Sequence, residues 1–254
     1  MTERLRILVF DAIGYVAHFR KHFTTTSSLS YTFPPRTTVC GMVAGILGYD
    51  RNTYYDKFSS EKCKIGLMIM KPVRRLVQTL NYLMTDEEAI GYLRKHGKWS
   101  AMPAQVRREL VMVDSTTLSQ LQYRIFFHHE EDKIMEDLKL ALSAKKFHYP
   151  PSMGTADNLA TLEYVDEVEA EVYHPKNEVY IHTVAPASKV RLCPEKGLRI
   201  QIEELVQADF SEDRKVRRME NYFYEGNGKP IKVSVEGEVF KCKVRGEEVV
   251  GLFM

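Results

Sequence analysis

The sequence lacks the cysteine spacing of a metal ribbon and any apolar run long enough to cross a membrane. Its 254 residues include only four cysteines, Cys40, Cys63, Cys193 and Cys242. They are too far apart for a CxxC pair, so we expect reduced thiols. No apolar segment approaches the roughly 20 residues that span a bilayer, and the charged start MTERLRILVF does not contain the apolar stretch of a signal peptide. The protein is therefore expected to be cytoplasmic, with no membrane partner.

Several enzyme motifs are absent as well. The chain contains no GxxxxGK(S/T), GxGxxG or GxSxG segment. Nothing in the sequence therefore indicates nucleotide hydrolysis, dinucleotide binding or serine hydrolysis. Glu167, Glu169 and Glu171 share one face of a predicted strand, but no Asp or His cluster accompanies them, and magnesium sites normally draw carboxylates from separate elements. We therefore expect no metal and no cofactor. This acidic face is interpreted as solvated, with a basic partner subunit as the functional alternative.

The residues that are present indicate a globular protein with an uneven charge distribution. Hydrophobic residues make up 44% and charged residues 28% of the chain, as in soluble folded domains. Up to Arg108 there are 17 Lys and Arg against 8 Asp and Glu, which leaves 19 of the 36 basic and 26 of the 34 acidic residues for the remainder. A basic first part favours a polyanionic partner such as nucleic acid. Ordinary scatter of surface charge is the alternative.

Hydrophobic periodicity predicts an α+β fold. Strands are expected at residues 5–12, 63–80, 106–113, 122–128 and 162–172, the third and fourth of these as a hairpin pair, and helices at 39–47, 86–95 and 130–146. The first helix is expected to have Thr37 or Thr38 as its cap and to end at Gly48. This order of elements is that of a split βαβ, ferredoxin-like unit. We assign it to residues 1–173, with 81–105 as a projecting excursion, and assign a smaller β-rich domain to residues 174–254.

The most specific feature is the segment SYTFPPRTTVCG at residues 30–41. Two prolines stiffen the approach to a helix whose first N–H groups are free, and Arg36, Thr37 and Thr38 add donors at the same end. Gly41 and Gly45, one turn apart, allow a backbone or a phosphate to come close. The segment predicts an anion site. A helix packed tightly on a sheet explains the same residues.

Residues 31–48, YTFPPRTTVCGMVAGILG, follow a first strand ending in HF and closely resemble Cas family five, the CRISPR-associated Cascade backbone family of the RAMP superfamily. The resemblance extends to YPPSMG at 149–154 and LAT at 159–161, and it is greatest to the form found in type I-B systems. It implies an RRM-like RAMP domain with a thumb at about residues 81–105. It also implies a subunit that holds the crRNA 5′ handle in a surveillance complex of antiviral defence, joins the backbone filament to the large subunit, and meets target DNA through the assembled complex.

The resemblance and the basic residues together predict an RNA-binding set. Its members share positive charge, helix-end donors or aromatic character, and they are Arg20, Lys21, Arg36, Thr37, Thr38, Gly41, Arg74, Arg75, Lys98, Trp99, Arg107 and Arg108. Basic residues that flank Trp99 suit single-stranded nucleic acid through phosphate pairing and base stacking. A tryptophan that packs the excursion onto the body is the alternative. In the tail, Arg214, Lys215, Arg217 and Arg218 precede YFY and form a second basic and aromatic patch, which contacts RNA or the large subunit unless it is simply a solvated strand.

The sequence also contains candidate catalytic side chains. Some members of the resembled family cut CRISPR repeat RNA without metal, using tyrosine, lysine and histidine. The candidates in this chain are Tyr31, Lys21, His18, His22, His128 and His129. His128 and His129 are consecutive in a predicted strand, so their side chains point to opposite faces and at most one can serve as a base. No complete catalytic set aligns, and type I-B systems leave repeat cleavage to a separate endonuclease. We expect no enzyme activity, with a metal-independent endoribonuclease as the alternative.

Overall fold

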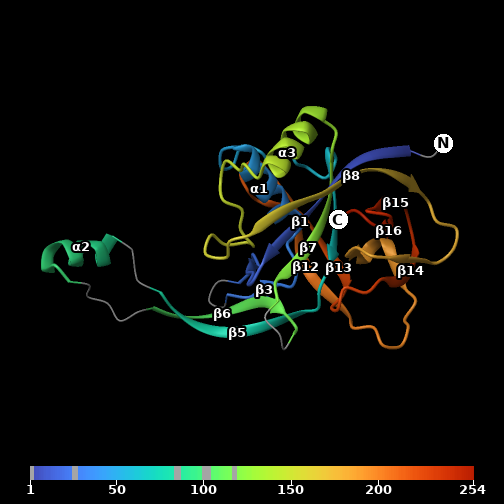
Figure 1. Cartoon of the computed structure of the whole chain (residues 1–254). Coiled ribbons are helices and arrows are strands. Elements are labelled where there is room, and N and C mark those ends of the chain that lie inside the picture. The colour runs from blue at the N-terminus through green and yellow to red at the C-terminus, as the bar shows by residue number, and fades with distance from the viewer. Residues whose placement is uncertain (1–2, 25–27, 83–86, 99–103, 116–118) are drawn as a thin grey trace.

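The computed structural model describes residues 3–24, 28–82, 87–98, 104–115 and 119–254 (Figure 1). Its elements in chain order are β1 (Glu3–Gly14), β2 (Phe19–Arg20), β3 (Ser30–Tyr31), α1 (Arg36–Leu47), β4 (Cys63–Ile69), β5 (Val73–Tyr82), α2 (Glu87–His96), β6 (Ala104–Val113), β7 (Leu121–His129), α3 (Asp132–Ala144), β8 (Thr161–Tyr173), β9 (Val179–Ile181), β10 (Ala185–Pro186), the short 3-10 helix η1 (Ala187–Lys189), β11 (Val190–Leu192), β12 (Ile200–Phe210), β13 (Val216–Glu225), β14 (Ile231–Val235), β15 (Val239–Val244) and β16 (Glu247–Gly251). The described residues thus form an α+β protein that consists mostly of strands, with three α-helices. No helix among them is both long and apolar enough to cross a membrane.

The main sheet has six strands in the order β16-β15-β8-β1-β7-β4, and all neighbouring pairs are antiparallel. Helix α1 lies between β1 and β4 in the chain, and α3 lies between β7 and β8. The strand order β8-β1-β7-β4 with these two connecting helices is the split βαβ arrangement. The ferredoxin-like unit is thus formed by the predicted helices at 39–47 and 130–146 and by the predicted strands at 5–12, 122–128, 162–172 and the first part of 63–80.

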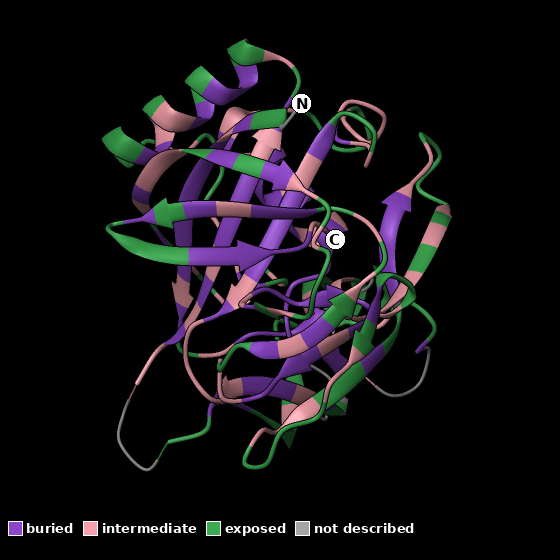
Figure 2. Ribbon diagram, turned by 90° about the vertical axis from the view of Figure 1, so that its right-hand side faces the viewer, coloured by how far each residue is buried: buried purple, intermediate pink, exposed green. Residues whose placement is uncertain are grey.

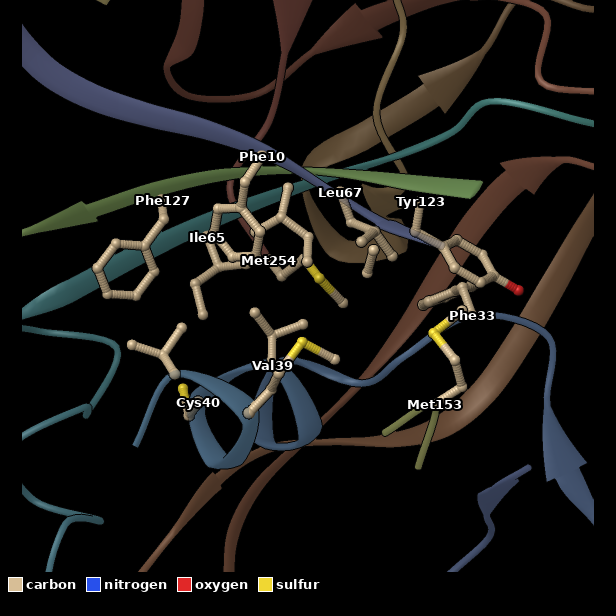
Figure 3. Packing of buried hydrophobic residues seen from close by; sticks show 14 of the residues in the cluster. Phe10, Phe33, Val39, Cys40, Ile65, Leu67, Tyr123, Phe127, Met153 and Met254 are labelled. Carbon is tan, nitrogen blue, oxygen red and sulfur yellow. The ribbon is translucent and has the colours of Figure 1, made fainter. Parts of the chain in front are cut away.

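Both faces of this sheet are buried. On one face, Phe10 of β1 packs in a cluster with Val39 of α1 and Leu138 of α3, and Figure 3 shows Val39 and Cys40 beneath the side chains of the strands. On the other face, Phe126 of β7 lies against Phe240 of β15, with ring centroids 5.3 Å apart. Figure 2 accordingly shows long buried stretches in the strands of this sheet. An RRM reads bases on an open sheet face, and here the β15–β16 hairpin covers that face.

The sheet continues across the predicted domain boundary between residues 173 and 174. Strand β15 pairs with β8 through Val239 and Tyr173. The amide of Met254 donates to the carbonyl of Ile65 at 2.9 Å, at the outer edge of β4. The tail also forms two sheets of three strands, β10-β13-β12 and β11-β14-β9. The division into two domains stays a prediction, and the tail contributes two strands to the first sheet.

The predicted excursion is part of a longer arm. Strands β5 and β6 form a sheet of two strands, from Val73 opposite Val113 to Tyr82 opposite Ala104, and α2 lies at the far end of this hairpin (Figure 1). Isolated bridges from Val111 to Ala17 and from Arg108 to Ser28 join β6 to the body. We call β5, α2 and β6 the arm. It begins near residue 73 because Pro72 interrupts the predicted strand region 63–80, which forms two strands instead of one.

The predicted hairpin of residues 106–113 with 122–128 is wrong. Strand β6 pairs with β5, whereas β7 lies between β1 and β4. The physical reason is burial: β7 is buried on both faces and needs two neighbours in the sheet centre, whereas most of β5 is exposed. A pattern that alternates in one strand does not identify which neighbour it pairs with.

Candidate nucleic-acid interface

The two sequence segments that carry the resemblance line one open cleft. Its volume is about 660 Å³. Its lining includes Arg20, His22, Thr37, Thr38, Gly41, Gly45, Tyr54, Tyr55, Tyr149, Pro150, Pro151, Ser152, Gly154, Gln207, Phe210 and Arg214. We call this space the cleft. Residues more than 100 positions apart in the sequence thus form one concave surface.

Main-chain hydrogen bonds hold the 149–154 segment against α1. The amide of His148 donates to the Ile46 carbonyl at 3.1 Å, and that of Tyr149 donates to the Gly45 carbonyl at 3.2 Å. Gly154 has φ +97°, and a Cβ there would lie 2.2 Å from the carbonyl oxygen of His18. The motif therefore requires glycine at this position, because the chain passes directly over the end of the first strand region.

The N-terminal end of α1 opens into the cleft. The helix begins at Arg36 with Pro35 as its N-cap, and no side chain caps it, so the predicted caps Thr37 and Thr38 are wrong. The amides of Thr38 and Val39 both donate to the Pro35 carbonyl. The hydroxyls of Thr37 and Thr38 line the cleft without a hydrogen-bond partner among the described residues. They remain free to bind a ligand at the positive end of the helix dipole. The predicted end at Gly48, with φ +79°, is confirmed.

Arg36 does not face the cleft. Its side chain is 1% exposed, and its guanidinium donates to Asp209 Oδ1 at 2.8 Å and to the carbonyls of Ala208, Phe58 and Cys63. The predicted phosphate contact of Arg36 is therefore corrected to a structural ion pair. The sequence places Arg36 at the helix start, but this position turns its side chain inward, toward β12 and β4.

Three more residues that were predicted to contact RNA form ion pairs within the protein. Arg108 is 5% exposed and donates to Asp157 at 2.6 Å and to the hydroxyl of Tyr82 at 2.7 Å. This pairing lowers the pKa of Asp157 to about 2. Lys21 donates to Glu203 at 2.9 Å. Arg75 lies 3.5 Å from the same carboxylate. Arg75 and Arg108 thus bind the arm to the body, whereas Lys21 joins two segments of the body. Arg108 in particular has almost no exposed surface for RNA.

The remaining predicted residues fall into two groups. Arg20, Thr37, Thr38 and Gly41 line the cleft. The exposed residues Arg74 and Arg107 belong to the arm, the exposed Lys98 follows α2, and none of the three lines the cleft. Trp99 lies outside the described residues. The predicted set is thus divided between two surfaces of the protein.

An aromatic wall of the cleft was missed from the sequence. The rings of Tyr54 and Tyr55 lie 4.7 Å apart, and Tyr55 also contacts Phe210 edge to face at 5.6 Å. Tyr149, which belongs to the YPPSMG segment, also lines the cleft and is 48% exposed. Tyr54 and Tyr55 come from an irregular segment without periodicity, so their only signal in the sequence was that they are consecutive tyrosines.

The candidate catalytic residues converge only in part. Lys21 Nζ lies 5.0 Å from the centre of the Tyr31 ring, whereas His18, His128 and His129 bond elsewhere. The Tyr31 hydroxyl donates to the Leu205 carbonyl, and burial with the nearby Glu203 raises the pKa of Tyr31 well above its usual value. His129 uses both ring nitrogens, on the Lys57 carbonyl and the Glu131 amide. Among the candidate histidines, only His22 lines the cleft, where burial lowers its pKa.

The remaining candidates bind elsewhere. The His128 ring contacts the Arg6 carbonyl at 2.8 Å, whereas the His129 ring contacts the Lys57 carbonyl. These different partners agree with the prediction that the two side chains point to opposite faces of the strand. His18 contacts the Glu109 carbonyl and the Ser28 hydroxyl. Among the described residues, no group of three or more His, Cys, Asp and Glu is arranged to hold a metal ion.

Comparison with known proteins identifies relatives of this chain. The model of the family described as CRISPR-associated protein (Cas_Cas5) matches residues 7–225. No curated protein matches. A crystal structure of a CRISPR protein from Archaeoglobus fulgidus is 17% identical, covers 98% of this chain and 99% of its own, and superposes with a TM-score of 0.55, which indicates a shared fold.

Two assemblies also contain similar chains. A chain of a CRISPR RNA-guided surveillance complex is 12% identical, with 91% of each chain covered and a TM-score of 0.43. A chain of the type III-B Cmr-beta complex bound to cognate target RNA and AMPPnP is 12% identical, with 89% of this chain and 86% of that chain covered and a TM-score of 0.47.

The buried position of Arg36 leads to a stability prediction. Arg36→Ala leaves the Asp209 carboxylate buried without its main partner, which is expected to lower the free energy of unfolding by about 3–5 kcal/mol. Urea denaturation followed by circular dichroism measures this change. Arg20→Ala, which removes an exposed arginine beside the cleft, is the control and should change it by less than about 0.5 kcal/mol. An Arg36→Ala protein of unchanged stability would contradict the structural assignment.

Proposed function

We propose that this chain, which belongs to the CRISPR-associated Cas5 family, is the subunit that holds the 5′ handle of the crRNA in a type I surveillance complex of antiviral defence. The observation that carries the proposal is the cleft, where the two segments of family resemblance meet. Family membership implies a RAMP fold, and the split βαβ sheet supports an RRM-like RAMP domain at residues 1–173. The same segments favour the type I-B form.

The cleft offers the three kinds of contact that single-stranded RNA requires. The free hydroxyls of Thr37 and Thr38 and the positive end of α1 suit a phosphate. Arg20 and Arg214 add positive charge at the rim. Exposed Tyr149 offers a ring face for base stacking, worth about 1–3 kcal/mol for each stacked base. RNA binding in this mode needs no open sheet face, which agrees with the burial of both faces.

The arm suits an assembly role. Its strand β5 exposes Leu76 and Val77, at 42% and 52%, beside the exposed Arg74, and among the strands that the structure describes β5 pairs with β6 alone. Such a surface fits the thumb that contacts the adjacent filament subunit. The β-rich tail, assigned to residues 174–254, would join the large subunit, and the protein would meet target DNA only within the complex.

The proposal includes no catalysis, cofactor or metal. It is supported by how the candidate residues are bound. Lys21 lies 5.0 Å from the Tyr31 ring, but its ammonium pairs with Glu203 and the Tyr31 hydroxyl donates to the Leu205 carbonyl. Of Lys21, Tyr31 and His22, only His22 lines the cleft. A tyrosine–lysine–histidine set for 2′-OH attack would need these side chains around one reacting atom. The alternative function is a metal-independent endoribonuclease that uses His22.

Removing charge from the cleft should weaken RNA binding. The double substitution Arg20→Ala and Arg214→Ala removes two phosphate contacts. The binding constant for RNA should therefore fall less steeply with salt: the magnitude of the slope of its logarithm against log salt concentration should be smaller by ~0.7 for each contact. Fluorescence anisotropy with labelled handle RNA measures this slope. The matched control is Lys176→Ala with Lys196→Ala, two exposed lysines that do not line the cleft. Equal losses in both double variants would contradict a specific cleft site.

Repeat RNA should remain intact in the presence of the protein. We expect no discrete product on a denaturing gel after incubation in EDTA, because no base and acid converge on one atom. His22→Ala and the double variant His128→Ala with His129→Ala serve as comparisons. A cyclic-phosphate product that His22→Ala abolishes would contradict the non-catalytic function and establish the endoribonuclease.

A further inference from the structure

The basic patch that precedes YFY in the tail connects the cleft to a second cavity. Arg214 lines the cleft, and Arg218, which bonds Asp209, lines a second cavity of about 450 Å³. The residues between them form the turn into β13 and its first positions, a path of at most about 14 Å. A strand of nucleic acid that leaves the cleft over this turn reaches the second cavity.

Three cations from separate elements face this second cavity. They are Lys64 of β4, Lys189 of η1 and Arg218 of β13. Neither Lys64 nor Lys189 has a carboxylate within ion-pair distance in the described part of the chain. The ammonium of Lys64 lies 5.9 Å from the centre of the Phe253 ring, which itself stacks on Phe240. Burial, Arg218 and Lys64 together lower the pKa of Lys189.

The acidic residues near the cavity leave an excess of positive charge. Glu236 pairs with Arg191 at 3.0 Å, and Glu220 accepts from the Ser188 hydroxyl at 2.8 Å. Glu220 keeps its negative charge in this hydrogen bond, and both Glu220 and Glu238 act to raise the pKa of Lys189. The lining of the cavity itself contains three cations and two carboxylates, Glu236 and Glu238, which leaves one net positive charge. Repulsion between converging cations is unfavourable unless an anion joins them, and a phosphodiester carries a single negative charge.

The wall between the two cavities is rigid. Asp209 Oδ1 accepts from Arg36 and from the Ser60 amide, and Oδ2 accepts from the Ser60 hydroxyl at 2.6 Å and from Arg218 at 3.3 Å. Arg218 and Ser60 both line the second cavity. The same ion-pair network thus fixes the floor of the second cavity and the start of α1 beside the cleft.

We propose that the second cavity binds a phosphodiester group of a single-stranded nucleic acid that continues from the cleft along residues 214–218. This inference rests on the proposed RNA-binding function. The group belongs either to the crRNA beyond its handle or to a DNA strand in the assembled complex, and the chemistry of recognition is the same. A nucleic acid too short to leave the cleft would not reach this site.

The test compares oligonucleotide length and charge reversal. The double variant Lys64→Glu with Lys189→Glu is measured by fluorescence anisotropy against a short handle RNA, an extended RNA and an extended DNA of the same sequence. Lys176→Glu with Lys196→Glu is the control with the same change of net charge. Thermal melting by circular dichroism verifies that each variant is folded. We expect about a tenfold weaker affinity for the extended RNA, with the short RNA and the control changed less than about twofold.

The measurement with extended DNA identifies the source of the phosphate. An equal loss for extended DNA indicates a site for either backbone, and a loss for RNA alone indicates the crRNA. If the Lys64 and Lys189 variant binds the extended RNA as tightly as the wild type, whereas Arg20→Ala with Arg214→Ala binds it weakly, the second site is overturned and the proposed function stands. If neither variant loses affinity, the proposed function fails as well.

Discussion

The buried ion pair between Arg36 and Asp209 determines how the parts of this protein fit together. The guanidinium at the start of α1 donates to Asp209 of β12 at 2.8 Å. It also donates to the carbonyl of Phe58, before β4, and to that of Cys63, the first residue of β4. A helix, the central sheet and the tail therefore meet at one charged group. Such a pair contributes little net stability by itself, but loss of one partner leaves a costly buried charge. The geometry of the cleft follows from this fixed helix start.

The second set of contacts positions the arm relative to the cleft. Arg108 of β6 binds Asp157, which follows the YPPSMG segment of the cleft, and Arg75 of β5 approaches Glu203 of the tail. Movement of the arm would therefore break contacts on two sides of its base. In the proposed function, these contacts would set the angle between the RNA site and the projecting arm.

Periodicity predicted the strands and helices of the split βαβ unit, because burial of one helix face or of alternate strand residues is a local property. It did not predict the partner of β6, since pairing depends on which strands need two neighbours. The role of Arg36 was also hidden, because its partner Asp209 is 173 positions away in the sequence. The cleft was predicted in part: Arg20, Thr37, Thr38 and Gly41 line it, whereas the tyrosine wall comes from segments without a repeating pattern.

The claim that the cleft holds the RNA is tested most directly by photo-cross-linking. Handle RNA that carries 4-thiouridine is irradiated with the wild-type protein, and the attached peptides are identified by mass spectrometry. The account predicts cross-links to residues 19–22, 37–45, 54–55 or 149–154, which surround the cleft. Efficient cross-links confined to the β9, β11 and β14 sheet or to the acidic strand β8, with none at the cleft, would contradict it.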